Sequence, residues 1–152
     1  IKMADLTVTV TENVILNNER RGSTNTVTIA DILNTFERMV VCTHSETTTI
    51  ATFATAPYTS AGAIDVENVR YIRVTNLDAE GALVLAVVTT NTNYQVRLTP
   101  GTSHIIPRGE AEIIGEEDTT PAFSTLENIT SLQVRPEGTE HNPQVEIFVA
   151  TV

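Results

Sequence analysis

The strongest constraint on the fold of this chain is a series of short apolar runs between residues 68 and 114, each followed by residues that turn the backbone. Gly and Asn in the intervening segments tolerate positive φ, and Pro fixes φ at a value that suits turns. Runs of this kind, spaced at roughly 8–12 residues, are typical of antiparallel all-β domains. The spacing therefore predicts an antiparallel meander inside a sandwich or barrel. The runs cover Val69–Val74, Leu83–Val88, Tyr94–Leu98, and His104–Ile106 with Ile113 and Ile114.

The N-terminal segment alternates apolar residues with threonine in two places. In the first, Leu6–Thr11, the leucine and two valines share one face of a predicted strand and the threonines share the other, because strand side chains point alternately to opposite faces. The pattern recurs over residues 25–32. We expect Val14–Leu16 to continue the first strand past a bulge and Asn17–Ser23 to form a polar loop. The threonine face is either solvated or in contact with a partner.

The signals after residue 29 are mixed. Helical spacing of the apolar residues and a capping aspartate predict a short helical turn over Asp31–Thr35. Strands are expected over Phe36–Thr43 and from Thr47 to Phe53. The segment Ala54–Ala63 is long and rich in small residues, and we expect it to be a loop that crosses between two sheets.

Together these patterns predict an all-β fold. We expect an antiparallel β-sandwich of jelly-roll type, formed by residues 1–152 as a single domain, with at most one or two short helical turns. The apolar segment Val145–Val152 is expected to be a central strand. Because aromatic residues make up 5% of the chain and Trp is missing, the core must be filled with Val, Ile, Leu and Ala. The predicted core consists of Val8, Val10, Ile29, Ile72, Val74, Leu83, Leu85, Val96, Leu98, Ile106, Val134, Ile147 and Val149.

The charge balance argues against a nucleic-acid partner. The chain has 19 acidic and 9 basic residues, a formal net charge of −10, and such a surface repels phosphate. No segment approaches the roughly 18 uninterrupted apolar residues of a membrane-spanning helix, so no membrane contact is expected. The single cysteine, Cys42, excludes an internal disulfide framework and a Cys-rich zinc site. Its apolar neighbours predict a buried, unreactive thiol.

No residue pattern predicts catalysis or a bound cofactor. The local signature of a nucleophilic serine is missing, and His44, His104 and His141 are too far apart in sequence to suggest a metal site. Two acidic loops, at residues 76–80 and 116–118, could supply some oxygen ligands to calcium, but neither has the regular spacing of a calcium-binding loop. We therefore expect no enzyme activity, no metal site and no cofactor.

The segments Tyr71–Asp78 and Tyr94–Ile106 carry a pattern in which YIRVTNLD is followed by a second strand and by LTPGTSHII. This pattern resembles one in small virion structural proteins of tailed phages, in particular those of marine and cyanobacterial phages. The resemblance covers residues 69–106. It implies a component of a virion, assembled in the host cytoplasm. It does not imply a position in the particle, and no functional residue is carried over from the family.

The resemblance and the lack of a catalytic pattern both favour a non-enzymatic phage virion structural protein. We expect a capsid decoration or cement protein that contacts the shell and copies of itself, as a homo-oligomer such as a trimer. Two alternatives stay open: a tail or fibre component, and a carbohydrate-binding β-sandwich module of an adhesin. The scarcity of aromatic residues disfavours sugar binding, which usually uses stacked rings.

Basic residues are scarce in this acidic chain, and guanidinium groups pair well with carboxylates. Arginines are therefore the first candidates for contacts with a partner protein, and the threonine-rich strand faces and polar loops offer further contact surface. The predicted contact residues are Arg20, Arg21, Arg70, Arg73 and Arg97.

Overall fold

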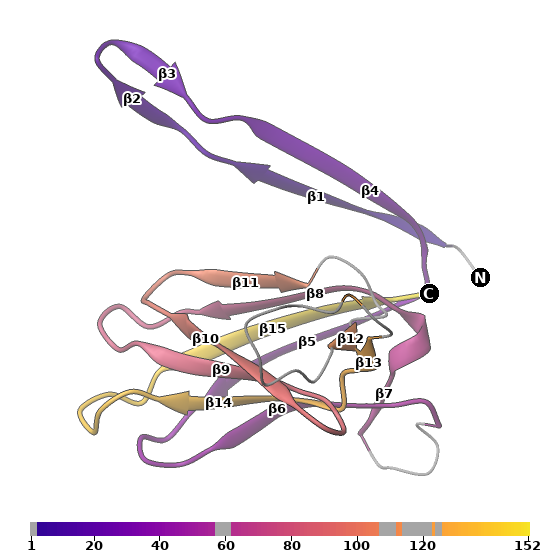
Figure 1. The fold of residues 1–152 in the computed structure, drawn as a ribbon. Helices are drawn as coiled ribbons and strands as arrows, with labels where there is room; N and C mark the ends of the chain where they lie inside the picture. Colours follow the sequence, from indigo (N-terminus) through magenta and orange to yellow (C-terminus); the bar gives the residue numbers. More distant parts are fainter. Residues whose placement is uncertain (1–2, 57–61, 107–111, 114–122, 124–125) are drawn as a thin grey trace.

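The computed structural model of the chain describes residues 3–56, 62–106, 112, 113, 123 and 126–152. Two sheets pack face to face as a β-sandwich, which confirms the predicted all-β class, and a long hairpin lies outside them (Figure 1). The strands that follow the hairpin are β5 (Asn34–Val41), β6 (Thr48–Ala54), β7 (Ile64–Asp65), β8 (Val69–Asn76), β9 (Leu83–Val88), β10 (Asn93–Leu98), β11 (Ser103–Ile106), β12 (Glu112–Ile113), β13 (Glu127–Asn128), β14 (Ser131–Pro136) and β15 (Gln144–Thr151).

The strands of the sandwich pair in a nested order. The four-stranded sheet has the order β11-β8-β15-β5, and the five-stranded sheet has the order β10-β9-β14-β6-β7. When the short strands β7, β12 and β13 are left out, eight strands of the sandwich remain. The first of them, β5, pairs with the last, β15, and the second, β6, pairs with the second last, β14. Inside these, β8 pairs with β11 and β9 with β10. Successive pairs alternate between the two sheets, so the chain resembles one long antiparallel hairpin folded into two layers.

The predicted meander over residues 68–114 is wrong, although its runs form strands wherever the structure describes them. Of these strands, β9 and β10 are consecutive neighbours in one sheet. The connections after β8 and after β10 carry the chain to the opposite sheet, so β11 pairs with β8 instead. Apolar periodicity identifies a strand but does not choose its partner, because the partner depends on where the connecting turn directs the chain.

The core between the two sheets is largely aliphatic and contains most of the residues predicted for it. Val8, Ile29 and Val96 are only half-buried, and the prediction is wrong for Val10, which is 43% exposed. Of these, all but Val96 belong to the hairpin outside the sandwich. The predicted core residues that are buried are Ile72, Val74, Leu83, Leu85, Leu98, Ile106, Val134, Ile147 and Val149.

The C-terminal strand is central, as its apolar sequence predicts. It lies between β8 and β5, and Val145, Ile147 and Val149 are completely buried. Cys42 follows β5 and is also completely buried, and this burial raises the pKa of its thiol. A raised pKa leaves little thiolate at neutral pH, in agreement with the predicted unreactive side chain.

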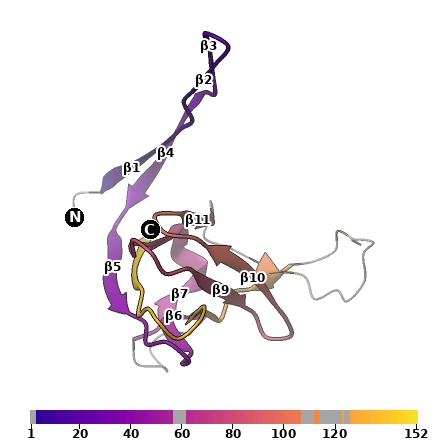
Figure 2. The same cartoon turned by 90° about the vertical axis from the view of Figure 1, so that its left-hand side faces the viewer.

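The hairpin consists of β1 (Ala4–Thr11), β2 (Val14–Leu16), β3 (Glu19–Arg21) and β4 (Thr24–Ile32), with β1 paired to β4 and β2 to β3. We call the whole hairpin the arm, and residues 14–21 its tip. Figures 1 and 2 show the arm starting near the C-terminus and extending away from the four-stranded sheet. The arm is the part of the fold that the sequence patterns did not reveal as a separate element.

Two local predictions within the arm are wrong. The polar loop expected over Asn17–Ser23 is instead a tight turn followed by β3. Asn17 and Asn18 have φ of 53° and 61°, which are the left-handed values of a two-residue hairpin turn. The pair of asparagines after Val14–Leu16 was the sequence signal for this turn.

The helical turn predicted over Asp31–Thr35 is also wrong. Strands β4 and β5 are separated by Leu33 alone. Asp31 has a φ of 64°, a left-handed conformation that aspartate tolerates better than most residues, and it redirects the chain from the arm into the sandwich. A 3₁₀ turn does occur over Val66–Asn68, where the Asp65 carboxylate accepts a hydrogen bond of 3.1 Å from the Glu67 backbone N–H.

Candidate functional site

The arm has one polar and one apolar face. Residues of β1 and β4 pair one to one from Leu6 with Ile29 to Thr11 with Thr24. Paired residues of an antiparallel ladder point to the same face, so threonines face threonines. On the other face Leu6 meets Ile29 and Val8 meets Val27, whereas Val10 meets Asn25. On the threonine face, hydroxyl groups bond across the strands, with 3.1 Å between the Oγ1 atoms of Thr9 and Thr26.

The base of the arm packs on the outer face of the four-stranded sheet. Its apolar residues contact a small cluster built on Ile32, Tyr71 and Ala150. Tyr71 and Phe148 meet edge to face within this cluster, with ring centroids 6.0 Å apart. A backbone hydrogen bond of 2.9 Å from Leu33 N–H to the carbonyl oxygen of Thr151 attaches the arm to the last strand. The partly buried residues that join the cluster are Leu6, Val8, Ile29, Ile105, Phe148 and Val152.

The apolar face of the arm becomes uncovered towards the tip. Leu6 and Ile29 at the base are half-buried, whereas Val27 is 54% exposed. At the tip, Val14 and Leu16 are exposed and Ile15 is 73% exposed. The cause is visible in Figure 1, where the arm diverges from the sheet as it extends. These aliphatic residues have no neighbour within the described part of the chain that covers them.

The tip combines apolar and basic residues on both of its faces. Ile15 pairs with Arg20 on one face, while Val14 pairs with Arg21 on the other. The Arg21 guanidinium also forms an ion pair of 3.0 Å with Glu19. Gly22, just behind the tip, has a φ of 103°, and a Cβ there would lie 2.3 Å from the carbonyl oxygen of Glu12. The bend between the tip and the rest of the arm therefore requires glycine.

A wedge-shaped cleft of about 390 Å³ lies between the arm and the sheet. One wall is β1, from Leu6 to Val10, and the other wall is formed by Glu37, Tyr71, Arg73, Ile105 and Phe148. We call this cleft the wedge. Beyond it, on β5, Met39 is 62% and Val41 is 60% exposed. The apolar side chains of both walls therefore become more exposed with distance from the base of the arm.

The structure places the predicted contact arginines in separate regions. Arg20 and Arg21 lie together at the arm tip, and Arg73 lies in the wedge, where it pairs with the carboxylate of Glu146. Arg70 donates hydrogen bonds of 2.9 and 3.0 Å to backbone carbonyl oxygens near the 3₁₀ turn. Arg97 lies on the other sheet and forms an ion pair of 2.8 Å with a glutamate. Their role in partner contacts stays a prediction.

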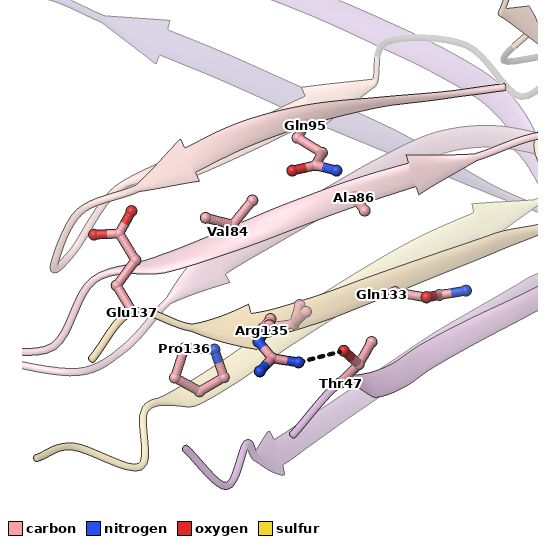
Figure 3. Close-up of a pocket in the computed structure, with 9 residues that line it drawn as sticks. Thr47, Val84, Ala86, Gln95, Gln133, Arg135, Pro136 and Glu137 are labelled. Atoms are coloured by element: carbon pink, nitrogen blue, oxygen red, sulfur yellow. Dashed lines mark hydrogen bonds between the residues drawn. The ribbon is translucent and has the colours of Figure 1, made fainter. Parts of the chain in front are cut away.

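A second depression lies on the outer face of the five-stranded sheet (Figure 3). Its volume is about 360 Å³, and small residues of β9, Val84 and Ala86, form its floor. Gln95 and Gln133 flank Ala86 on the two neighbouring strands. The Arg135 guanidinium donates a hydrogen bond of 3.5 Å to the Thr47 hydroxyl. This bond is the dashed line in Figure 3. We call this depression the amide groove, since its walls offer amide and guanidinium donors.

His141 and the acidic loop at residues 76–80 are engaged in local structure. The Asp78 carboxylate accepts backbone N–H groups of Glu80 and Gly81, and these bonds lower its pKa. His141 is 4.0 Å from the Glu80 carboxylate. The described residues contain no cluster of three or more His, Cys, Asp or Glu suited to a metal ion, and the acidic loop at residues 116–118 lies outside them.

His104 and Tyr94 form a partly buried pair beside the sandwich. The Tyr94 hydroxyl and His104 Nε2 are 2.8 Å apart, and burial lowers the pKa of His104. In the unfolded chain the histidine pKa is about 6.5. As the pH falls below that value, the unfolded chain binds a proton before the folded chain does, so stability should fall.

We expect replacement of His104 by glutamine to reduce this pH dependence. The measurement is the urea midpoint of wild type and His104→Gln at pH 7.5 and 5.5, with His44→Gln, in the loop after β5, as the control. A His104→Gln protein that loses as much stability as wild type over this range would contradict the prediction.

The described residues thus define an all-β sandwich that carries a projecting hairpin arm, a partly open wedge and a shallow amide groove. Among them, no helix is long and apolar enough to cross a membrane. No protein-family model, no curated protein and no solved structure matches this chain.

Proposed function

We propose that this chain is a non-enzymatic structural protein of a phage virion, in particular a capsid decoration or cement protein that contacts the shell and copies of itself. The observation that carries the proposal is the arm, whose tip presents three exposed aliphatic residues, Val14, Ile15 and Leu16. Exposed aliphatic residues grouped on one projecting element mark a protein-interaction site, because contact with a partner removes them from water.

The strand pairing supports a jelly-roll assignment for the sandwich. Nested pairing of eight strands, alternating between two sheets, is what results when a long hairpin is rolled into two layers. Jelly rolls occur in viral capsid domains and also in lectins. A fold alone does not define a function, so the virion assignment depends on the arm and on the resemblance at Tyr71–Asp78 and Tyr94–Ile106.

The proposal is tested by locating the chain on purified particles of the phage that encodes it. Antibodies against the chain should label intact virions at repeated positions in electron micrographs, and quantitative mass spectrometry should find many copies per particle. The proposal would be overturned if the chain is abundant in the lysate of infected cells but the purified particles are unlabelled and do not contain it. Labelling restricted to the tail would reject the capsid decoration protein and support a tail component instead.

The amide groove supports carbohydrate binding as a second candidate function. Gln95 and Gln133 face the same floor residue, Ala86, from opposite sides, and paired amides can bond successive sugar hydroxyls. A glycan array probed with wild type and with Gln133→Ala should show binding that the substitution removes. An array without any binding would reject this candidate.

A further inference from the structure

The arm tip and the wedge have matching shapes and chemistry. The tip is a thin two-stranded element with aliphatic residues on both faces, Ile15 on one and Val14 with Leu16 on the other. The wedge is a cleft between two walls, and each wall carries aliphatic or aromatic residues. An element with aliphatic residues on both faces fits a cleft with apolar residues on both walls, since insertion covers the apolar parts of all four surfaces together.

The tip cannot enter the wedge of its own chain. The path from Ala4 to Leu16 is 13 residues of nearly continuous strand, and at about 3.3 Å per residue it extends to about 43 Å. The eight residues of β15 span only about 26 Å on the same scale. The tip therefore lies at the far end of a hairpin that begins near the C-terminus, as Figure 1 shows.

Charge complementarity favours a second copy of this chain as the partner of the arm tip. The net charge of the chain is −10, but the tip holds Arg20 and Arg21, two of its nine basic residues. In the wedge, Glu37 lies opposite Phe148 in the ladder, and its carboxylate makes no ion pair or hydrogen bond within the described chain. A guanidinium group entering with the tip would find this carboxylate beside an aromatic surface.

Within one chain, aliphatic residues at the base of the arm already pack on this sheet face. Leu6 and Val8 of the arm pack on the four-stranded sheet at the base. Farther from the base, the same sheet face offers Met39 and Val41, which are exposed. The unfilled part of the wedge thus continues an existing interface between arm and sheet.

We propose that the arm tip of one copy docks in the wedge of a second copy, between the second copy's arm and its four-stranded sheet. Ile15 and its neighbours lie against Met39 and the aromatic pair, and Arg20 or Arg21 meets Glu37. The proposal rests on the proposed function, since it supplies the contact between copies in the repeating assembly. It commits to a second copy of this chain as the occupant.

Cross-linking between two differently tagged chains tests the docking directly. One chain carries Ile15→Cys and the other carries Met39→Cys, and both positions are exposed, so neither change should disturb folding. The native Cys42 is completely buried, so we expect it not to react with the cross-linker. With a short bismaleimide, we expect a mixed cross-linked dimer. The control pairs Ile15→Cys with Thr52→Cys, an exposed position on the five-stranded sheet, and should give none.

No mixed dimer, or an equal yield with the Thr52→Cys control, overturns the docking. A charge test provides a second measurement by analytical ultracentrifugation. Reversing the tip charges with Arg20→Glu and Arg21→Glu should weaken association by about tenfold or more, and adding Glu37→Arg should restore it. Association that the tip reversal leaves unchanged overturns the proposal as well.

The two proposals can fail separately. A chain that labels virions but forms no mixed dimer keeps its proposed function and loses the arm-to-wedge contact. A chain that forms the mixed dimer but is missing from virions keeps the contact and loses the virion assignment.

Discussion

Replacement of Asn76 by alanine should lower the free energy of unfolding by about 3–5 kcal/mol, because it leaves several buried polar groups without partners. Asn76 ends β8 and is completely buried. Its side-chain N–H groups donate to the carbonyl oxygens of Gly81, at 2.9 Å, and Leu98, at 3.0 Å. Its side-chain oxygen accepts a hydrogen bond of 3.0 Å from the Asp78 N–H. One side chain thus joins the corner after β8 to the end of β10.

The measurement is urea denaturation at pH 7, with Asn93→Ala as the matched control. Asn93 is exposed, so its loss should cost less than about 0.5 kcal/mol. An Asn76→Ala protein as stable as the control would show that water replaces the lost bonds at no cost, and would contradict the role of this side chain at the corner.

An aspartate at position 76 gives a second readout of the same site. The carboxylate of Asn76→Asp would face two carbonyl oxygens, which repel it, and burial disfavours its charge. Its folded-state pKa should therefore lie above the unfolded value of about 3.9, so the protonated form is favoured in the native state. Compared with wild type, this variant should regain stability as the pH falls towards 4, because the protonated group can again donate a hydrogen bond.

Truncation of Ile147 to alanine should cost about 2–5 kcal/mol, whereas truncation of Val10 should cost less than about 0.5 kcal/mol. Ile147 is completely buried in the central strand β15, so its truncation leaves a cavity between the sheets. Val10 lies on the arm and is 43% exposed, so its truncation leaves none.

The two variants are compared by their urea denaturation midpoints, provided that the dependence of the unfolding free energy on urea concentration is the same for both. Both residues belong to alternating apolar patterns and look equivalent in the sequence. A loss of unfolding free energy for Val10→Ala similar to that for Ile147→Ala would mean that the arm packs against the sandwich over its whole length. That result would contradict an arm that diverges from the sheet.

The sequence by itself determined the elements and the class of the fold. Turn residues between short β-branched runs predicted strands at Val69–Val74, Leu83–Val88 and Tyr94–Leu98, and a strand is present at each. The largely apolar last segment predicted a central strand, because apolar residues on both faces of a strand favour its burial. These features are local, since a strand's alternation and a turn's backbone angles depend on adjacent residues.

Tertiary structure alone decided which strands pair and which faces are covered. The alternation at Leu6–Thr11 correctly assigned two faces to β1, but nothing in the segment indicates that the sheet beneath it ends before the arm does. The nested pairing likewise depends on corners such as Asn76, whose partners lie 5 and 22 residues away in the sequence. The wedge exists because two segments far apart in the chain diverge in space. Coverage, pairing and clefts are relations between distant segments, and periodicity within one segment does not contain them.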